Sequence, residues 1–298
     1  MGRVPAVEWP TLALIALSYA VWALGTTWAA ALFLPLGMVM VVLAAALHSS
    51  LCHEVLHGHP TRHRWLNEAL VFPQLTLLIP YGRFRDTHIE HHRDERLTDP
   101  YDDPETNYLD PAIWHRLPGW WRGVLRFNNT LAGRLLVGPL VAQVAFMAGD
   151  WRRIRAGEPG VLAAWLIHVP AVAAVIWWMA AFGRMPVWAW LLASYAALSI
   201  LKIRTFLEHR AHEEVPGRTV IIEDRGPLAF LFLNNNLHVV HHSLPGVPWY
   251  RLWALYRAER DRFRQMNDSY LYRSYGEVFR RYFWRAKDPV PHPLWKDH

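Results

Sequence analysis

Three short stretches of this sequence crowd histidines at regular spacing. "HEVLHGHP" begins at residue 53, "DTHIEHHRD" at residue 86 and "NNNLHVVHHS" at residue 234. Residues three and four positions apart share one face of a helix, so each stretch would direct its imidazoles to one side. Protonated imidazoles repel one another and a buried one needs a partner, so this crowding predicts metal binding. The histidines at this spacing are His53, His57, His88, His91, His92, His238, His241 and His242.

The number of these histidines indicates more than one metal ion. A zinc ion is usually satisfied by four ligands, whereas the three stretches together offer eight imidazoles. Two ions that each keep a coordination position open would use all of them. Imidazole does not name the metal, because iron, copper, zinc and nickel all accept it. The first stretch also reads H-E-x-x-H, which is typical of zinc metalloproteases and leaves a membrane zinc protease as a remote alternative.

Further candidates lie close to the three stretches. "RTFLEHRAHEE" begins at residue 204 and offers a ninth imidazole from His209 or His212, of which His209 is favoured because it follows the preceding apolar segment more closely. Glu208 could orient a ligand through a hydrogen bond. His59 is expected beside the site or at the surface rather than as a ligand. Asn234 could hold a metal-bound water, although helix capping is the favoured role for the asparagines there.

The elements that would position these residues are apolar helices. A helix of ~20 apolar residues crosses a bilayer core, and four segments of about that length contain no charged residue: 9–28, 29–50, 160–182 and 185–201. Two weaker apolar stretches, 69–80 and 135–148, are predicted to be interfacial helices. The fold class is therefore an all-α membrane protein with about four transmembrane helices, interfacial helices and a histidine-rich cytoplasmic cap.

The distribution of charge predicts the orientation. Arginines and lysines gather at 62–96, 152–155 and 202–204, which places both termini and the metal site on the cytoplasmic side of an inner or plasma membrane. The net charge of +6 in a chain with 53% apolar residues indicates a basic membrane face rather than a nucleic-acid surface. One cysteine excludes an intrachain disulfide and an iron–sulfur site built from this chain alone. The acidic segment 93–109 is expected to be a solvated loop.

"HEVLH", "HIEHH" and "HVVHH", in this order between paired apolar segments, resemble the three histidine boxes of the integral-membrane fatty acid desaturase and hydroxylase family. The resemblance covers roughly residues 10–260, so we expect one desaturase-like domain over residues 1–298. Its expected parts are a first helical pair at 9–50, boxes one and two with interfacial helices at 51–159, a second helical pair at 160–201, and box three with a basic aromatic tail at 202–298.

The resemblance implies a non-haem di-iron centre with O2 as co-substrate. In the family the box histidines ligate iron, a role that passes to the eight histidines named above, and the ninth family ligand best matches His209. The implied substrate is an acyl lipid chain and the favoured reaction is desaturation. The same site could instead hydroxylate or ketolate an alkane, an acyl chain or a carotenoid.

The resemblance also implies an external electron donor of the ferredoxin, rubredoxin or cytochrome b5 type. No fused cytochrome b5 domain is expected, because the tail after residue 250 is short and lacks the haem motif. A basic cytoplasmic face would attract an acidic donor.

Overall fold

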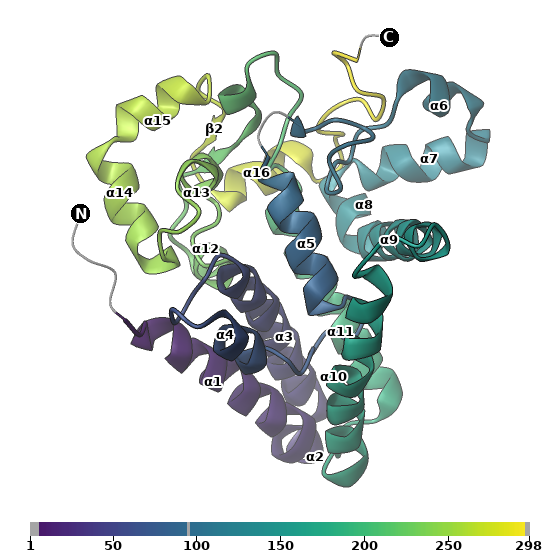
Figure 1. Cartoon of the computed structure of the whole chain (residues 1–298), viewed down its shortest axis with the longest axis vertical. Coiled ribbons are helices and arrows are strands. Elements are labelled where there is room, and N and C mark those ends of the chain that lie inside the picture. The colour runs from purple at the N-terminus through teal and green to yellow at the C-terminus, as the bar shows by residue number, and fades with distance from the viewer. Residues whose placement is uncertain (1–5, 94–95, 296–298) are drawn as a thin grey trace. The chain divides into compact units, whose positions relative to one another are not determined.

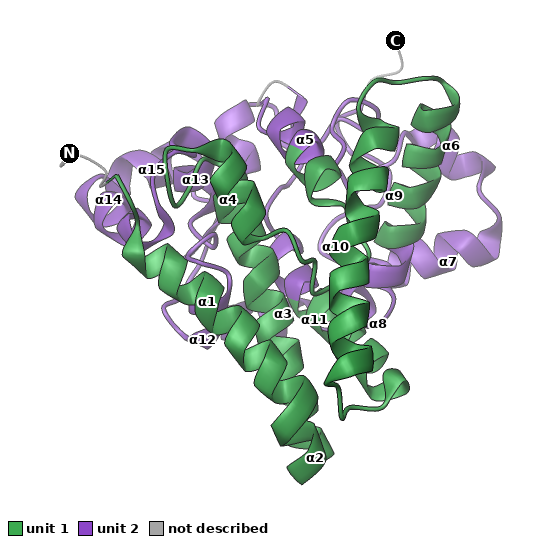
Figure 2. Ribbon diagram, turned by 60° about the horizontal axis from the view of Figure 1, so that its bottom comes forward, with its two compact units in different colours: residues 1–85, 142–200 green, residues 86–141, 201–298 purple. Residues whose placement is uncertain are grey.

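The computed structural model describes residues 6–93 and 96–295 (Figure 1). The described chain is 65% helix and 3% strand, which confirms the predicted fold class. It divides into two compact units, unit 1 with residues 1–85 and 142–200 and unit 2 with residues 86–141 and 201–298 (Figure 2). Both chain ends, for which the sequence predicts a cytoplasmic location, lie outside the described residues.

Among the described residues, four helices are long and apolar enough to cross a membrane, as the hydropathy pattern predicts. Their bounds are Trp9–Leu32, Leu34–Leu56, Val161–Ala181 and Val187–Thr205. Many of their large apolar side chains face outward, such as Trp28, Leu166 and Trp188, each more than 60% exposed. A soluble protein rarely exposes so much contiguous apolar surface, whereas a lipid-facing helix does.

The first two spans divide later than the predicted break after residue 28. The first span consists of α1 (Trp9–Leu24), a π-helical turn (Gly25–Ala29) and α2 (Ala30–Leu32). Phe33 then adopts an extended backbone, and Pro35 lies in the first turn of α3 (Leu34–Leu56). The predicted break is wrong because the threonines in the π-helical turn bond back to the carbonyl of Ala23 and do not open a loop.

The helices α1 and α3 lie side by side in unit 1 (Figure 2). Their close approach depends on Gly37, because a Cβ atom added there would lie 2.6 Å from the carbonyl oxygen of Gly25. The helix α3 also continues past its predicted end at residue 50. It therefore carries the first histidine box as a rigid extension of the second span.

The predicted interfacial helix at 69–80 is wrong. Only its first two residues are helical, at the end of α4 (Arg64–Leu70), and turns follow as far as Pro80. Pro73 lacks an N–H donor, and the side chain of Gln74 donates to the carbonyl of Val71 at 2.7 Å, so a turn replaces the helix. The other weak stretch, 135–148, is helical almost throughout and lies mostly in α9 (Gly138–Arg155).

The remaining helices of unit 1 are longer, and three of them begin in one unit and end in the other. One of these three, α5, begins directly after Pro80 and ends in the second histidine box. The remaining helices are α5 (Tyr81–His91), α9 (Gly138–Arg155), α10 (Val161–Ala181) and α11 (Val187–Thr205).

Unit 2 consists mainly of short elements. Its helices are α6 (Pro111–Arg116), α7 (Gly119–Asn128), α8 (Leu131–Leu136), α12 (Pro227–Leu231), α13 (His238–Ser243), α14 (Leu252–Ala258), α15 (Arg260–Met266) and α16 (Tyr275–Tyr282), with 3-10 turns at Val215–Arg218 and Trp249–Arg251. Its two strands, β1 (Ile221–Ile222) and β2 (Leu271–Tyr272), pair in parallel. A buried apolar cluster formed by β1, α13, α14 and α15 packs these elements together.

The helix α13 shows how this unit positions the third box. Its sequence HVVHHS places Val239 and Val240 on the face that packs into the apolar cluster, where they are 2% and 0% exposed. The histidines at i, i+3 and i+4 therefore share the opposite face, as their spacing predicts. Burial of the valines fixes the direction in which the imidazoles point.

Candidate metal centre

Four imidazoles from three separate segments converge in unit 2, and we name them the four-histidine group. They are His91 at the end of α5, His209 in the loop after α11, and His238 and His242 on α13. Their potential ligand atoms all lie within 4.8 Å of one another. The Nε2 atom of His209 lies 2.8 Å from that of His91 and 3.0 Å from that of His238.

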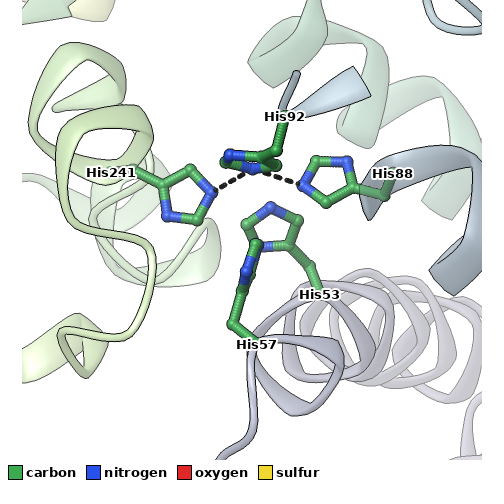
Figure 3. A group of neighbouring side chains, drawn as sticks. All are labelled: His53, His57, His88, His92 and His241. Atoms are coloured by element: carbon green, nitrogen blue, oxygen red, sulfur yellow. Dashed lines mark hydrogen bonds between the residues drawn. The ribbon is translucent and has the colours of Figure 1, made fainter. Parts of the chain in front are cut away.

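A second set of imidazoles gathers beside the first, and we name it the three-histidine group. It contains His88, His92 and His241, again from α5 and α13 and the residue that follows α5 (Figure 3). The Nε2 atom of His92 lies 3.0 Å from that of His88 and 3.1 Å from that of His241. Alternate histidines of boxes two and three thus enter different groups.

Neighbouring side chains fix which ring nitrogen carries the proton. The Nδ1 atom of His91 donates to Asp103 Oδ1 at 2.8 Å, and that of His88 donates to Glu105 Oε1 at 2.8 Å, because a carboxylate can only accept. The Nδ1 atom of His238 lies 3.2 Å from the amide oxygen of Asn235. When such a ring is neutral, its Nε2 atom presents a lone pair to the other imidazoles, an arrangement that a proton or a metal ion can satisfy.

Burial keeps most of the four-histidine group in the form that binds metal. Loss of solvent, and then repulsion between neighbouring rings, lowers the pKa of His209, His238 and His242 well below the ordinary value. Burial acts in the same direction on His91, but Glu105 and Asp103 outweigh it and raise the pKa of His91 to about 9. A metal ion that binds His91 therefore displaces a proton.

The donor set fits metal ions that prefer nitrogen. Two nitrogens bound to one ion at ~2.1 Å and at right angles lie about 3.0 Å apart, close to the 2.8–3.1 Å separations of the Nε2 atoms. Neutral imidazoles suit iron, copper, zinc and nickel. Seven imidazoles in two adjacent groups therefore form a candidate metal-binding site within unit 2.

The histidines of box one lie together on α3 in unit 1. His53 is in the last turn of that helix and His57 is its C-cap residue, and their ring centroids are 5.0 Å apart (Figure 3). Their potential ligand atoms lie within 4.8 Å of each other. The spacing of four residues thus places both imidazoles on one side of α3, as predicted.

The structure separates the two candidates for the ninth imidazole. His209 belongs to the four-histidine group, whereas Nδ1 of His212 lies 3.0 Å from the carbonyl of Glu214 and its Nε2 lies 3.3 Å from Asp268. The loop at His209 is held by a β-bridge to Thr219. The conformation of this loop places His209, and not His212, beside the other imidazoles. The loop has no helical period, so the spacing of the two histidines could not show this.

The other candidates near the boxes have different surroundings. Glu208 accepts a hydrogen bond from the amide of Asn235 at 2.9 Å, and through Asn235 it reaches His238. Asn234 instead donates to the carbonyl of Trp249. The expected capping role is wrong, because Leu237 is the N-cap residue of α13 and no side chain caps it.

His59 is buried in unit 1 with two carboxylates. Its Nδ1 atom lies 2.7 Å from Glu8 Oε1, and its Nε2 atom lies 3.9 Å from Glu54 Oε1. All three residues are less than 7% exposed. Burial lowers the pKa of His59, but Glu8 and Glu54 outweigh it and raise that pKa. The surface location considered for His59 is therefore excluded.

Sequence reasoning missed the carboxylates that orient box two. The segment 93–109 was expected to be a solvated loop, but Asp103 is 4% exposed and accepts from His91, while Glu105 accepts from His88. The sequence did contain a signal for them. Two carboxylates, two residues apart, follow box two closely enough for the chain to fold back and bring them to its histidines. Asp103 also accepts from the backbone N–H groups of Thr98 and Glu105, which folds the loop back.

We expect the Asp103→Asn variant to bind metal 10- to 100-fold more weakly than the wild type, as is typical when a partner of a ligating histidine is changed. The amide can present its own N–H to His91 Nδ1, which disturbs both the orientation and the basicity of the ring. The measurement is a Co²⁺ titration of the metal-free protein. Asp102→Asn is the matched control, because Asp102 is exposed; equal affinities in the two variants would refute the role of Asp103.

The spans and the converging imidazoles together define an integral membrane protein with a metal-binding site. A sequence model of the fatty acid desaturase family matches residues 8–274. This match covers most of the chain and includes every histidine of both groups, so the chain belongs to the fatty acid desaturase family. A comparison with curated proteins found no match. Membership makes the chain an oxidoreductase of the desaturase or hydroxylase type that acts on fatty acyl chains. In this family the H-E-x-x-H pattern is part of a histidine box.

Proposed function

We propose that this protein is an O2-dependent di-iron desaturase that introduces a double bond into an acyl lipid chain. The observation that carries the proposal is the pair of adjacent imidazole groups with converging Nε2 atoms in unit 2. Imidazole donors with additional coordination positions are typical of iron sites that react with O2. Family membership supplies the substrate class.

The proposed ligand set assigns one iron ion to each group. One ion would bind the four-histidine group. The other would bind the three-histidine group completed by His53 and His57 of box one, whose shared face on α3 supports this assignment. The nine histidines of the proposal are His53, His57, His88, His91, His92, His209, His238, His241 and His242.

The bound irons would supply the activation of O2 and the removal of hydrogen from an unactivated carbon. The roles of the chain itself are to hold and orient. Asp103 and Glu105 keep protons on Nδ1 of His91 and His88, and Asn235 does the same for His238. The overall reaction removes two hydrogens from adjacent carbons, and with two electrons and two protons the O2 is reduced to two waters.

The electrons are proposed to come from a separate donor of the ferredoxin, rubredoxin or cytochrome b5 type. A single cysteine provides no iron–sulfur or rubredoxin site within this chain. We propose that the metal site faces the cytoplasm, because the loops rich in arginine and lysine follow the histidine-bearing ends of the spans. An acidic donor would be attracted to that face.

The test is a mass-spectrometric lipid profile of cells that express the chain, compared with cells that express His91→Ala. We expect acyl species that have lost two hydrogens in the wild type only, because the variant lacks the imidazole that His91 contributes to the four-histidine group. Co-expression of each class of donor ensures that electron supply does not limit the result. Iron content per purified chain is measured in parallel.

The possible outcomes separate the reactions. A species that gains one oxygen would replace desaturation by hydroxylation at the same site. One zinc ion and no iron per chain would contradict the di-iron assignment. Iron without O2 consumption in the presence of a reduced donor would indicate a metal-binding protein that is not an enzyme.

A further inference from the structure

A segment near the C-terminal end of the described chain, residues 286–292, contacts two other segments of unit 2 through its backbone. The N–H group of Lys287 donates to the carbonyl of Asn129 at 3.0 Å. The carbonyl of Val290 accepts from the N–H group of Leu109 at 3.0 Å. We name residues 286–292 the tail segment. These hydrogen bonds fix it against the end of the loop that follows box two, at Leu109, and against the end of α7, at Asn129.

One side chain of the tail segment reaches the backbone of the metal centre. The Nζ atom of Lys287 donates to the carbonyl oxygen of His209. The Lys287 side chain is only 10% exposed, so this hydrogen bond is shielded from water. The loop around His209 is also held by a β-bridge to Thr219, by a hydrogen bond from the Tyr270 hydroxyl to the carbonyl of Leu207, and by one from Arg218 to the carbonyl of His212. Among these contacts, Lys287 bonds the carbonyl of His209 itself, so it acts directly at the residue that carries the imidazole.

A second side chain of the tail segment supports the same loop two residues further on. The hydroxyl of Tyr108 donates to Asp288 Oδ2 at 2.5 Å and accepts from the N–H group of Ala211 at 2.9 Å. Tyr108 belongs to the loop that also carries Asp103 and Glu105. The tail segment thus connects the loop that orients box two with the loop that carries the ninth imidazole.

We propose that the tail segment is a positioning element of the metal centre. Lys287 holds the loop of His209 directly, and Asp288 holds it through Tyr108. Together they keep the His209 imidazole at the separation from its neighbours that lets it share an ion with them. This inference rests on the proposed function. The tail segment lies beyond residues 8–274, so the family match does not cover it. A loop lacks the repeating hydrogen bonds of a helix, and a ligand must be held to within a few tenths of an ångström.

The test uses the full-length, metal-free protein in detergent, titrated with Co²⁺ and followed by its d–d absorption. We expect Lys287→Met to weaken binding of one Co²⁺ by 10- to 100-fold, which is the usual effect of losing a group that hydrogen-bonds a ligand residue. The absorption spectrum of that Co²⁺ should change, and the spectrum of the other should not. Lys287→Arg should restore most of the affinity because it can still donate to the carbonyl. Arg285→Met, which removes an exposed cation two residues away, is the matched control.

Hydrogen–deuterium exchange on the same metal-free proteins supplies a second readout. Amides of residues 207–212 should exchange faster in Lys287→Met and in Tyr108→Phe than in the wild type or Arg285→Met. Unchanged exchange together with wild-type Co²⁺ affinity in Lys287→Met would overturn the inference. A wild-type protein that binds no Co²⁺ would count against the proposed function instead, and the exchange comparison would still decide whether the tail segment holds this loop.

Discussion

On the proposed di-iron assignment, the His209→Ala variant is expected to purify with about one iron ion per chain instead of two, and to lose detectable product. His209 is the imidazole whose Nε2 atom lies within 3.0 Å of both His91 and His238, so its removal opens the centre of the four-histidine group. The loss of affinity should exceed the 10- to 100-fold effect that follows removal of an outer partner. Metal analysis of the purified protein measures the iron, and lipid mass spectrometry measures the product.

The same chain provides a close control for this variant. His212 is three residues away in the same loop, but its ring faces Asp268 and the carbonyl of Glu214. His212→Ala should therefore keep both irons and full activity. If the two variants lost iron equally, folding of the loop rather than ligation by His209 would explain the loss.

The Asp150→Leu variant is expected to lower the free energy of unfolding by about 3–5 kcal/mol, the usual cost of leaving one member of a buried ion pair alone. Asp150 on α9 accepts two hydrogen bonds from Arg83 on α5, both at 2.9 Å, and a third from the indole of Trp165 at 2.8 Å. Both charged side chains are about 5% exposed or less. Unfolding in detergent, followed by circular dichroism, measures the change.

The double variant Arg83→Met with Asp150→Leu distinguishes a buried charge from lost packing. Replacement of both members by apolar residues removes the unpaired charge, so the double variant should be more stable than Asp150→Leu alone. A double variant that is as unstable as the single one would show that the shape of the pair, not its charge, matters. Arg152→Met is the control, because Arg152 is exposed on the same helix.

The buried pair also bears on the metal centre, because Arg83 lies in the first turn of the helix that ends in box two. A helix transmits the position of its first turn to its last because every residue between is hydrogen-bonded. Asp150→Leu should therefore lower iron content as well as stability. Retention of full iron at temperatures where the variant is folded would indicate that the other end of α5 is held independently.

The spans and the boxes were predictable from the sequence because each depends on neighbouring residues. A bilayer admits only helices of about 20 apolar residues, so the spans are visible as uncharged segments. The spacing of box three places His238, His241 and His242 on one helical face regardless of the rest of the fold, and Val239 and Val240 on the other. The resemblance to fatty acid desaturases rests on these local patterns, and the family match confirms it.

Local signals were less informative where the chain leaves regular structure. The apolar stretch 69–80 has the composition of an interfacial helix, yet Pro73 and the side-chain bond of Gln74 turn it. The break between the first two spans was misplaced because the threonines at 26 and 27 can satisfy helical carbonyls as well as turns. Composition alone does not distinguish a helix from a turn in these two stretches, because the same residues are compatible with both.

By itself, then, the sequence determined that this is a helical membrane protein with three histidine boxes, because hydropathy and helical spacing act over a few residues. Only the tertiary structure decided which imidazoles meet. It placed His209 rather than His212 in the four-histidine group, divided boxes two and three between two groups, and brought Asp103 to His91 and Lys287 to His209 from loops. These choices depend on contacts between residues as far as 149 positions apart, as between His92 and His241, and loops carry no periodic pattern from which such contacts can be read.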